Sequence, residues 1–150
     1  MPTRLTSSFL LSALLAGCGA PRSAQREATV LDELQTAPER AVVFCHQCLT
    51  SAFEPQHVVK NAAQVRAILE KSCKVKAVFT GHQHSGLIDI AGGITYYSLR
   101  ALVLNSGEEE NAYALAEMYS SGEIRVTGYR KAPTAIITAA LMTSTSVSTC

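Results

Sequence analysis

The sequence predicts an α/β fold in which a parallel β-α-β unit is followed by antiparallel hairpins. Two short apolar runs, 41–44 and 75–80, have the composition of strands that are covered on both faces. Between them, apolar residues recur at helical spacing from 58 to 69, which predicts an amphipathic crossover helix that begins near Pro55. Strand-like segments then flank the turns at 92–93 and 120–122, which predicts two hairpins.

Length and charge narrow the class of protein. The chain has 150 residues, enough for one small domain with a real core. Its formal net charge is +1, and it contains no cluster of basic residues. We therefore expect no nucleic-acid partner, because such partners require a basic surface.

The first residues resemble an export signal. Arg4 precedes an apolar run at 9–16 that is too short to span a bilayer, so 1–17 is interpreted as a signal peptide. The run ends in Leu-Ala-Gly-Cys at 15–18, which resembles the bacterial lipobox, where the cysteine receives lipid. This interpretation predicts an exported lipoprotein anchored to a membrane through Cys18. The alternative is an apolar leader with a chance cysteine, or a misplaced start codon; without a real leader the chain would be cytoplasmic.

The remaining sequence divides into a linker, one domain and a tail. Residues 18–27 are interpreted as a linker, and the domain is expected over 28–132, beginning with a short helix at about 27–37. The acidic stretch at 107–110 is expected to be a solvated loop. Residues 133–150 carry no charge and are rich in Thr, Ser and Ala, so we expect a poorly ordered tail.

Three of the four histidines come directly after the two predicted parallel strands. His46 follows the first strand, and His82 and His84 follow the second, with Gly81 expected to let the backbone turn sharply. Neighbouring parallel strands place such loops side by side, so these imidazoles are expected to converge. Neutral imidazole suits zinc, manganese and iron, although an isolated pair of loop histidines often makes only ordinary hydrogen bonds.

These motifs resemble a known family. The stretch F-T-G-H-Q-H at 79–84 is similar to the final G-H-x-H motif of calcineurin-like metallophosphoesterases. V-V-F-C-H-Q at 42–47 resembles the motif before it, a strand that ends in one metal-binding histidine. The segments 92–99 and 113–129 are similar to the C-terminal strands of the branch that contains manganese-dependent ADP-ribose/CDP-alcohol diphosphatases.

The resemblance implies a fold, a cofactor and a reaction. The fold would be part of an α/β/β/α sandwich. His46 and His82 would bind one divalent ion, Mn, Zn or Fe, and His84 would bind a second. In the family, two metals activate a water that attacks phosphorus. The implied substrate is a phosphoester or a small molecule of the nucleoside-diphosphate type.

The sequence departs from the family at the carboxylates. The D-x-H, G-D-x-x-D and N-H-D/E motifs do not occur, and the only aspartates, Asp32 and Asp89, stand outside any matching motif. We therefore expect no efficient two-metal catalysis by this chain alone, and as few as one bound ion.

Two functional hypotheses remain open. In the first, the chain is the C-terminal part of a hydrolase whose other half is a separate chain or was lost from the gene model. In the second, it is a non-catalytic, lipid-anchored remnant or binding module with at most one structural metal. Half of the fold would leave a sheet edge and an apolar face uncovered, which predicts homo-oligomerisation or aggregation.

The C-x-x-C at 45–48 offers a different metal site. Cys45 and Cys48 could form a structural zinc site together with His82 and His84. Against this, Cys45 and His46 alternate along a strand and should point to opposite faces. The fourth histidine, His57, matches no motif and is interpreted as a surface residue at the start of the crossover helix, with substrate contact as the alternative.

Overall fold

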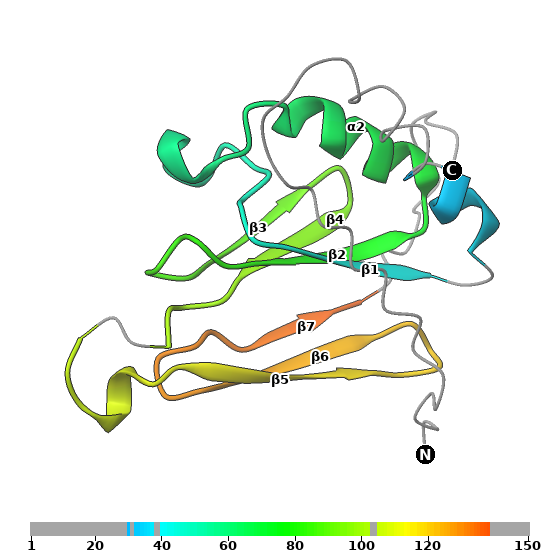
Figure 1. The fold of residues 1–150 in the computed structure, drawn as a ribbon. Helices are drawn as coiled ribbons and strands as arrows, with labels where there is room; N and C mark the ends of the chain where they lie inside the picture. The colour runs from blue at the N-terminus through cyan, green and yellow to red at the C-terminus, as the bar shows by residue number, and fades with distance from the viewer. Residues whose placement is uncertain (1–29, 31, 38–39, 103–104, 139–150) are drawn as a thin grey trace.

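A computed structural model describes residues 30, 32–37, 40–102 and 105–138 (Figure 1). The predicted signal peptide at 1–17, Cys18 and the linker at 18–27 lie outside the described residues, so those predictions stay predictions. The same holds for 139–150 of the predicted tail.

The first sheet has four strands in the order β1-β2-β4-β3. They are β1 (Ala41–Cys45), β2 (Val75–Thr80), β3 (Leu87–Ala91) and β4 (Ile94–Ser98). β1 pairs with β2 in parallel, β2 pairs with β4 in parallel, and β3 pairs with β4 as an antiparallel hairpin. The predicted parallel β-α-β unit and the first hairpin are confirmed.

The crossover helix starts later than predicted. Pro55–His57 form only a single 3₁₀ turn, η1, and α2 spans Ala62–Ser72. The N–H of Cys48 donates to the carbonyl of His57 at 3.0 Å, and the N–H of Val59 donates to the carbonyl of Cys48 at 3.0 Å. These bonds make an isolated parallel bridge between Cys48 and Val58, so this segment is extended and cannot continue as helix.

The second sheet has three antiparallel strands in the order β5-β6-β7, namely β5 (Tyr113–Met118), β6 (Ile124–Tyr129) and β7 (Ala135–Ile137). The predicted second hairpin is therefore present. β7 lies inside the range 133–150 for which the sequence suggested poor order. It is held there because Ala135 pairs with Val126 and the Ile137 side chain is buried.

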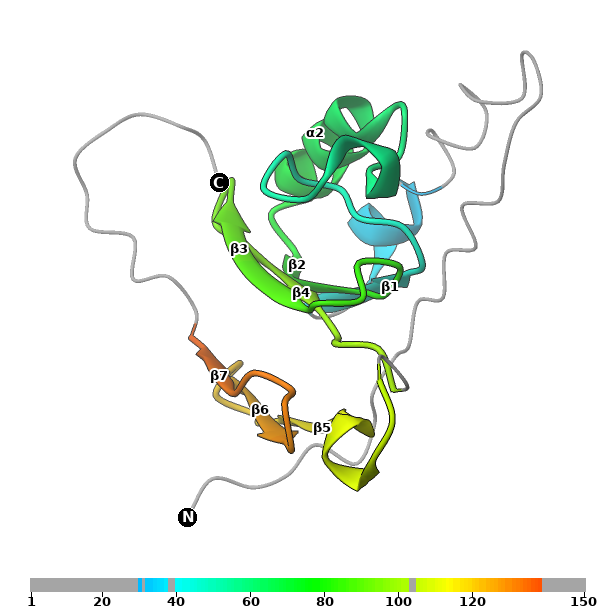
Figure 2. The ribbon, with the colours of Figure 1, turned by 90° about the vertical axis from the view of Figure 1, so that its left-hand side faces the viewer.

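The two sheets and the helices form three layers (Figure 2). Alternate residues of the strands pack on opposite faces of the first sheet. Val43, Val78 and Tyr96 pack with Val65 and Leu69 of α2. Their neighbours Val42, Ala77 and Tyr97 pack instead against the second sheet, where Ile124, Val126 and Ile137 complete a separate core. The first sheet is therefore covered on both faces, as the continuous apolar runs indicated.

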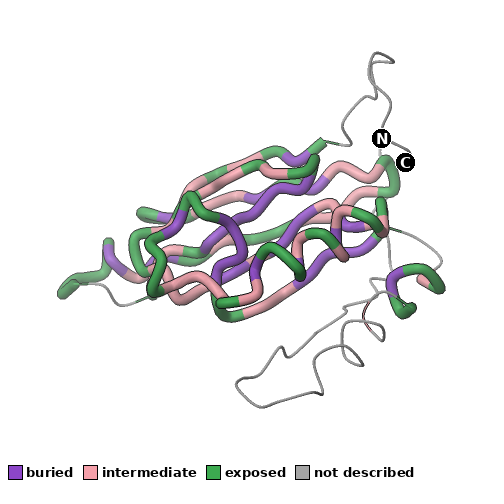
Figure 3. The backbone as a smooth tube through the Cα atoms, turned by 90° about the horizontal axis from the view of Figure 1, so that it is seen from above, coloured by how far each residue is buried: buried purple, intermediate pink, exposed green. Residues whose placement is uncertain are grey.

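The outer face of the second sheet is not covered by any helix of the described residues. Tyr113, Leu115, Tyr129 and Ile136 remain exposed there. The buried stretches of the backbone lie mainly in the strands of the first sheet (Figure 3). The observed architecture is thus helix, sheet and sheet, a partial form of the expected four-layer sandwich. No helix in the described part of the chain is both long and apolar enough to span a bilayer.

The acidic stretch at 107–110 was predicted to be a solvated loop, but it is partly buried in the structure. Glu108–Glu110 form a 3₁₀ turn, η2, and Glu110 is only 6% exposed. Its carboxylate pairs with Arg100 at 3.1 Å and also with Lys131. Hydrogen bonds from Lys131 and then from Arg100 lower the pKa of Glu110. The acidic residue is therefore part of the packing between distant segments.

Candidate metal site

Two histidines meet at the carboxyl ends of β1 and β2. Cys45 at the end of β1 pairs with Thr80 at the end of β2, so His46 and His82 leave the sheet at the same edge. The N–H of Gly81 donates to the carbonyl of His46 at 3.1 Å, which ties the two loops together. The register of the parallel pair therefore positions both imidazoles.

The sharp turn of this loop occurs at His82 rather than at Gly81. His82 has φ of 61°, whereas Gly81 does not have a positive φ. The left-handed region is unfavourable for residues other than glycine, and such conformations tend to occur at functional sites. The Ser98 hydroxyl donates to the carbonyl of Gly81 at 3.1 Å and helps to hold the turn.

The geometry of the His46–His82 pair suits a shared ion. His82 Nδ1 lies 3.1 Å from His46 Nε2, and the ring centroids are 4.9 Å apart. Two nitrogen ligands of one tetrahedral ion at about 2.05 Å would be separated by about 3.3 Å. The pair is also compatible with one ring donating a hydrogen bond to the other, because imidazole tautomers allow either role.

His57 joins this cluster, which corrects its interpretation as a surface residue. Its ring packs edge-on against His82 with centroids 5.0 Å apart, and its Nδ1 is buried without a hydrogen-bond partner in the described residues. The Glu54 carboxylate lies 3.8 Å from that nitrogen. The location of His57 could have been predicted from its position in the sequence. It lies in the loop after a parallel strand, and such loops gather at the carboxyl edge of the sheet.

His84 is less closely associated with the other rings. It is exposed, whereas His82 is partly buried. Burial, followed by the charges of His46, His57 and lastly His84, lowers the pKa of His82. The structure thus brings together His46, His82 and the unpredicted His57, and leaves His84 at the solvent side.

The donor set fits two metals poorly. In the described part of the chain, no group of three or more His, Cys, Asp or Glu side chains is arranged to hold a metal ion. Asp89, on β3, uses its carboxylate to accept a hydrogen bond from the N–H of Ile90. Among the described residues no carboxylate bridges the histidines, so the residues present fit two ligands of a single ion and not a dimetal centre.

The alternative zinc site is not assembled either. Cys45 and Cys48 are free thiols, but Cys48 is fully buried, with its Sγ 3.8 Å from the Thr80 hydroxyl. Burial, together with neighbouring Cys48, raises the pKa of Cys45 to about 11. A thiol with so high a pKa is protonated at neutral pH, and thiolate is the form that binds metal.

Comparisons with known proteins find solved structures that share this fold. No protein-family model matches the chain, and no curated protein matches its sequence. A dimetal phosphatase from Danio rerio is similar in structure, with a TM-score of 0.69 at 19% identity over 79% of this chain and 38% of that one. GAP50, the anchor in the inner membrane complex of Plasmodium, gives a TM-score of 0.66 at 12% identity over 91% of this chain and 53% of that one.

Identities this low show the fold alone. The chain is a mixed α/β protein with part of the fold of a dimetal phosphatase, in agreement with the predicted partial calcineurin-like architecture. It spans 38% of the phosphatase and 53% of GAP50. The relation to the ADP-ribose/CDP-alcohol diphosphatase branch stays a prediction.

Proposed function

We propose that His46 and His82 bind one divalent cation, and that the chain is the histidine-bearing part of a metal-dependent phosphoester or pyrophosphate hydrolase. The observation that carries this proposal is the 3.1 Å approach of His82 Nδ1 to His46 Nε2 at the ends of adjacent parallel strands. The similarity of the fold to a dimetal phosphatase supports the choice of reaction class.

The residues of this chain supply only part of such a reaction. A bound divalent ion would act as a Lewis acid toward a phosphoryl oxygen and would lower the pKa of its water. His46 and His82 hold the ion, and His57, packed against the ring of His82, restricts that ring's orientation. A second cation a few ångströms away would be repelled strongly without bridging carboxylates. We therefore expect residues 1–150 alone to show no efficient two-metal hydrolysis.

A second candidate is a non-catalytic module that holds at most one ion. The donor set of imidazoles without a bridging carboxylate favours it, and the structural neighbour GAP50 is described as an anchor. In this proposal a lipid on Cys18 would attach the module to a membrane. His46 and His82 would then stabilise the loops by binding metal, without turnover.

Hydrolysis of bis-p-nitrophenyl phosphate tests whether the isolated chain is itself a hydrolase. We expect the purified chain with Mn²⁺ to release p-nitrophenol no faster than a blank that contains Mn²⁺ alone. The matched controls are His82→Ala, which removes the proposed ligand, and Gln64→Ala, an exposed position on α2.

Turnover that is lost in His82→Ala and kept in Gln64→Ala would make the isolated chain a hydrolase and would contradict the module. Turnover that survives His82→Ala would eliminate the histidine pair as the site. Absence of turnover in the parent is the result that both candidates predict for the isolated chain.

A further inference from the structure

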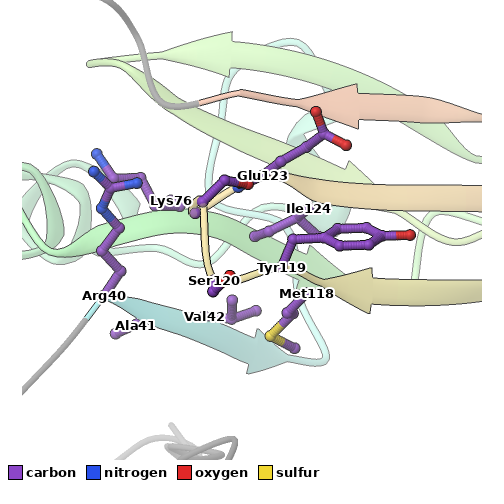
Figure 4. Close-up of a pocket in the computed structure, with 11 residues that line it drawn as sticks. Arg40, Ala41, Val42, Lys76, Met118, Tyr119, Ser120, Glu123 and Ile124 are labelled. Carbon is purple, nitrogen blue, oxygen red and sulfur yellow. The ribbon is translucent and has the colours of Figure 1, made fainter. Parts of the chain in front are cut away.

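A cavity of about 470 Å³ lies at the opposite ends of the strands from the histidines (Figure 4). It opens between the start of β1, residue Lys76 of β2, and the turn that joins β5 to β6. Its volume falls in the range of small-molecule sites, about 300–1,000 Å³. The histidine cluster contributes no side chain to it, so this cavity is independent of the proposed metal site.

Two basic side chains with free charge line the cavity. Within the described part of the chain, neither Arg40 nor Lys76 has an ion-pair or side-chain hydrogen-bond partner. The one carboxylate in the lining, Glu123, is paired with Arg125 at 2.8 Å, outside the cavity lining. The cavity therefore keeps a positive balance that its own walls do not neutralise.

An irregularity in the sheet accounts for the position of Lys76. Ala41 pairs with Val75, but Val42 pairs with Ala77, so the register shifts and Lys76 has no opposite residue on β1. A bulge of this kind re-aims the side chain of the extra residue. Here the re-aimed residue is a lysine, and it lines the cavity.

The turn between β5 and β6 is shaped around the other cation. Gly122 has φ of 83°, and a Cβ at this position would overlap the guanidinium of Arg40. Ser120 and Ser121 add hydroxyl groups to the same wall. Glycine here thus leaves room for the guanidinium beside groups that can donate hydrogen bonds to an anion.

Apart from the hydroxyl of Tyr119, the side chains of the remaining lining are apolar. Val42 and Ile124 are buried members of the core between the sheets, and Met118 packs against them. A ligand that fills this cavity therefore meets cations and hydroxyls on one side and hydrocarbon on the other. Inorganic phosphate alone would leave the apolar wall of the cavity exposed to water.

We propose that this cavity binds a small phosphate monoester, with its phosphoryl group against Arg40 and Lys76 and its organic group on Val42, Met118 and Ile124. A phosphate monoester is favoured over a carboxylate because it carries more charge and three acceptor oxygens, matching two cations and the serine hydroxyls. The site is separate from the histidine pair and does not depend on metal.

The test is a titration of the full chain with phenyl phosphate in EDTA, followed by NMR at the amides of Ser120 to Glu123. EDTA removes divalent ions, so metal-dependent binding at the histidines does not contribute. We expect saturable shifts at these amides, with phenyl phosphate bound roughly tenfold more tightly than inorganic phosphate, phenol or phenylacetate.

The variants Arg40→Gln and Lys76→Gln should each weaken phenyl phosphate binding by about tenfold, the size of one lost charged hydrogen bond. Lys71→Gln, which removes an exposed charge at the end of α2, should leave it unchanged. The proposal is overturned by absence of saturation in the millimolar range, by an equal loss in Lys71→Gln, or by shifts confined to the loops of His46 and His82.

Discussion

At the residue scale, two adjacent tyrosines of β4 are buried on opposite faces and differ in hydrogen bonding. The hydroxyl of Tyr97 donates to the carbonyl of Pro133 at 2.7 Å, which links the first sheet to the segment before β7. The hydroxyl of Tyr96 is buried without a partner in the described residues, and burial raises the pKa of Tyr96 to about 12.

The same substitution should have different effects on stability at these two tyrosines. Tyr97→Phe should lower the free energy of unfolding by about 1 kcal/mol, because the partly buried carbonyl of Pro133 loses its donor. Tyr96→Phe should change it by less than that or raise it, because an unpaired hydroxyl is removed from the core. Urea denaturation of both variants checks this. Equal destabilisation by the two substitutions would contradict the conclusion that only the Tyr97 hydroxyl is hydrogen-bonded.

Glu110 predicts a dependence of stability on pH. Its pKa is lowered in the folded protein by Lys131 and Arg100. A lowered folded-state pKa stabilises the fold at pH values above the ordinary carboxyl range, and this contribution is lost as the pH falls through the folded-state pKa. Glu110→Gln should therefore lower the Tm at pH 7.

The difference in Tm between the parent and Glu110→Gln should shrink steadily as the pH falls below about 4.3, the ordinary glutamate value. Thermal unfolding from pH 7 to pH 3 measures it. Glu109→Gln, at an exposed neighbouring residue of the same turn, is the matched control and should show little difference at any pH. A difference in Tm that stays constant across this pH range would exclude the charge of Glu110 as the cause of the destabilisation.

At the scale of elements, the strands that bear the histidines were predictable because they combine continuous apolar runs with a crossover helix between them. The two hairpin turns were predictable from glycine, and Gly92 and Gly93 indeed have positive φ of 55° and 74°. The delayed start of α2 was not predictable, because it depends on the bridge between Cys48 and Val58, which forms only in the folded chain.

The same limit applies to the candidate site. The positions of His46 and His82 follow from strand order and register, so the motif sufficed to place them. The position of His57 after a parallel strand places it near the same edge of the sheet, but its contact with His82 depends on the path of the loop before α2. The burial of Glu110 likewise depends on Arg100 and Lys131, which are 10 and 21 residues away in sequence.

The outer face of the second sheet predicts self-association. Leu115 and Ile136 are 52% and 61% exposed on strands that no helix of the described residues covers. Exposed apolar side chains on an uncovered sheet face favour contacts between copies. We expect light scattering after gel filtration to give a mass above that of the monomer, and the double variant Leu115→Lys/Ile136→Lys to shift it toward the monomer.

The control for that experiment is Ala63→Lys/Gln64→Lys, which adds the same charge at exposed positions of α2. Its mass should remain that of the parent. If both double variants dissociate equally, charge alone explains the effect, and the outer face of the β5–β6–β7 sheet is not the interface.

At the scale of the whole molecule, the fold places two independent features at opposite ends of the parallel strands. The histidine cluster lies at the carboxyl ends, and the basic cavity lies at the amino ends of β1 and β2. The chain shares part of the fold of a dimetal phosphatase, but its sequence lacks the D-x-H, G-D-x-x-D and N-H-D/E motifs expected of a two-metal centre. The central claim that we propose for this molecule is therefore the binding of a single ion by imidazoles.

Isothermal titration of the metal-free chain with Zn²⁺ tests that claim most directly, with Cys45→Ser as the control for binding to the partly buried thiol. We predict one ion per chain in the parent and in Cys45→Ser, with loss of at least tenfold in affinity in His46→Ala and in His82→Ala. Binding that is unchanged in both histidine variants, or a stoichiometry of two ions per chain that requires both histidines, would contradict it.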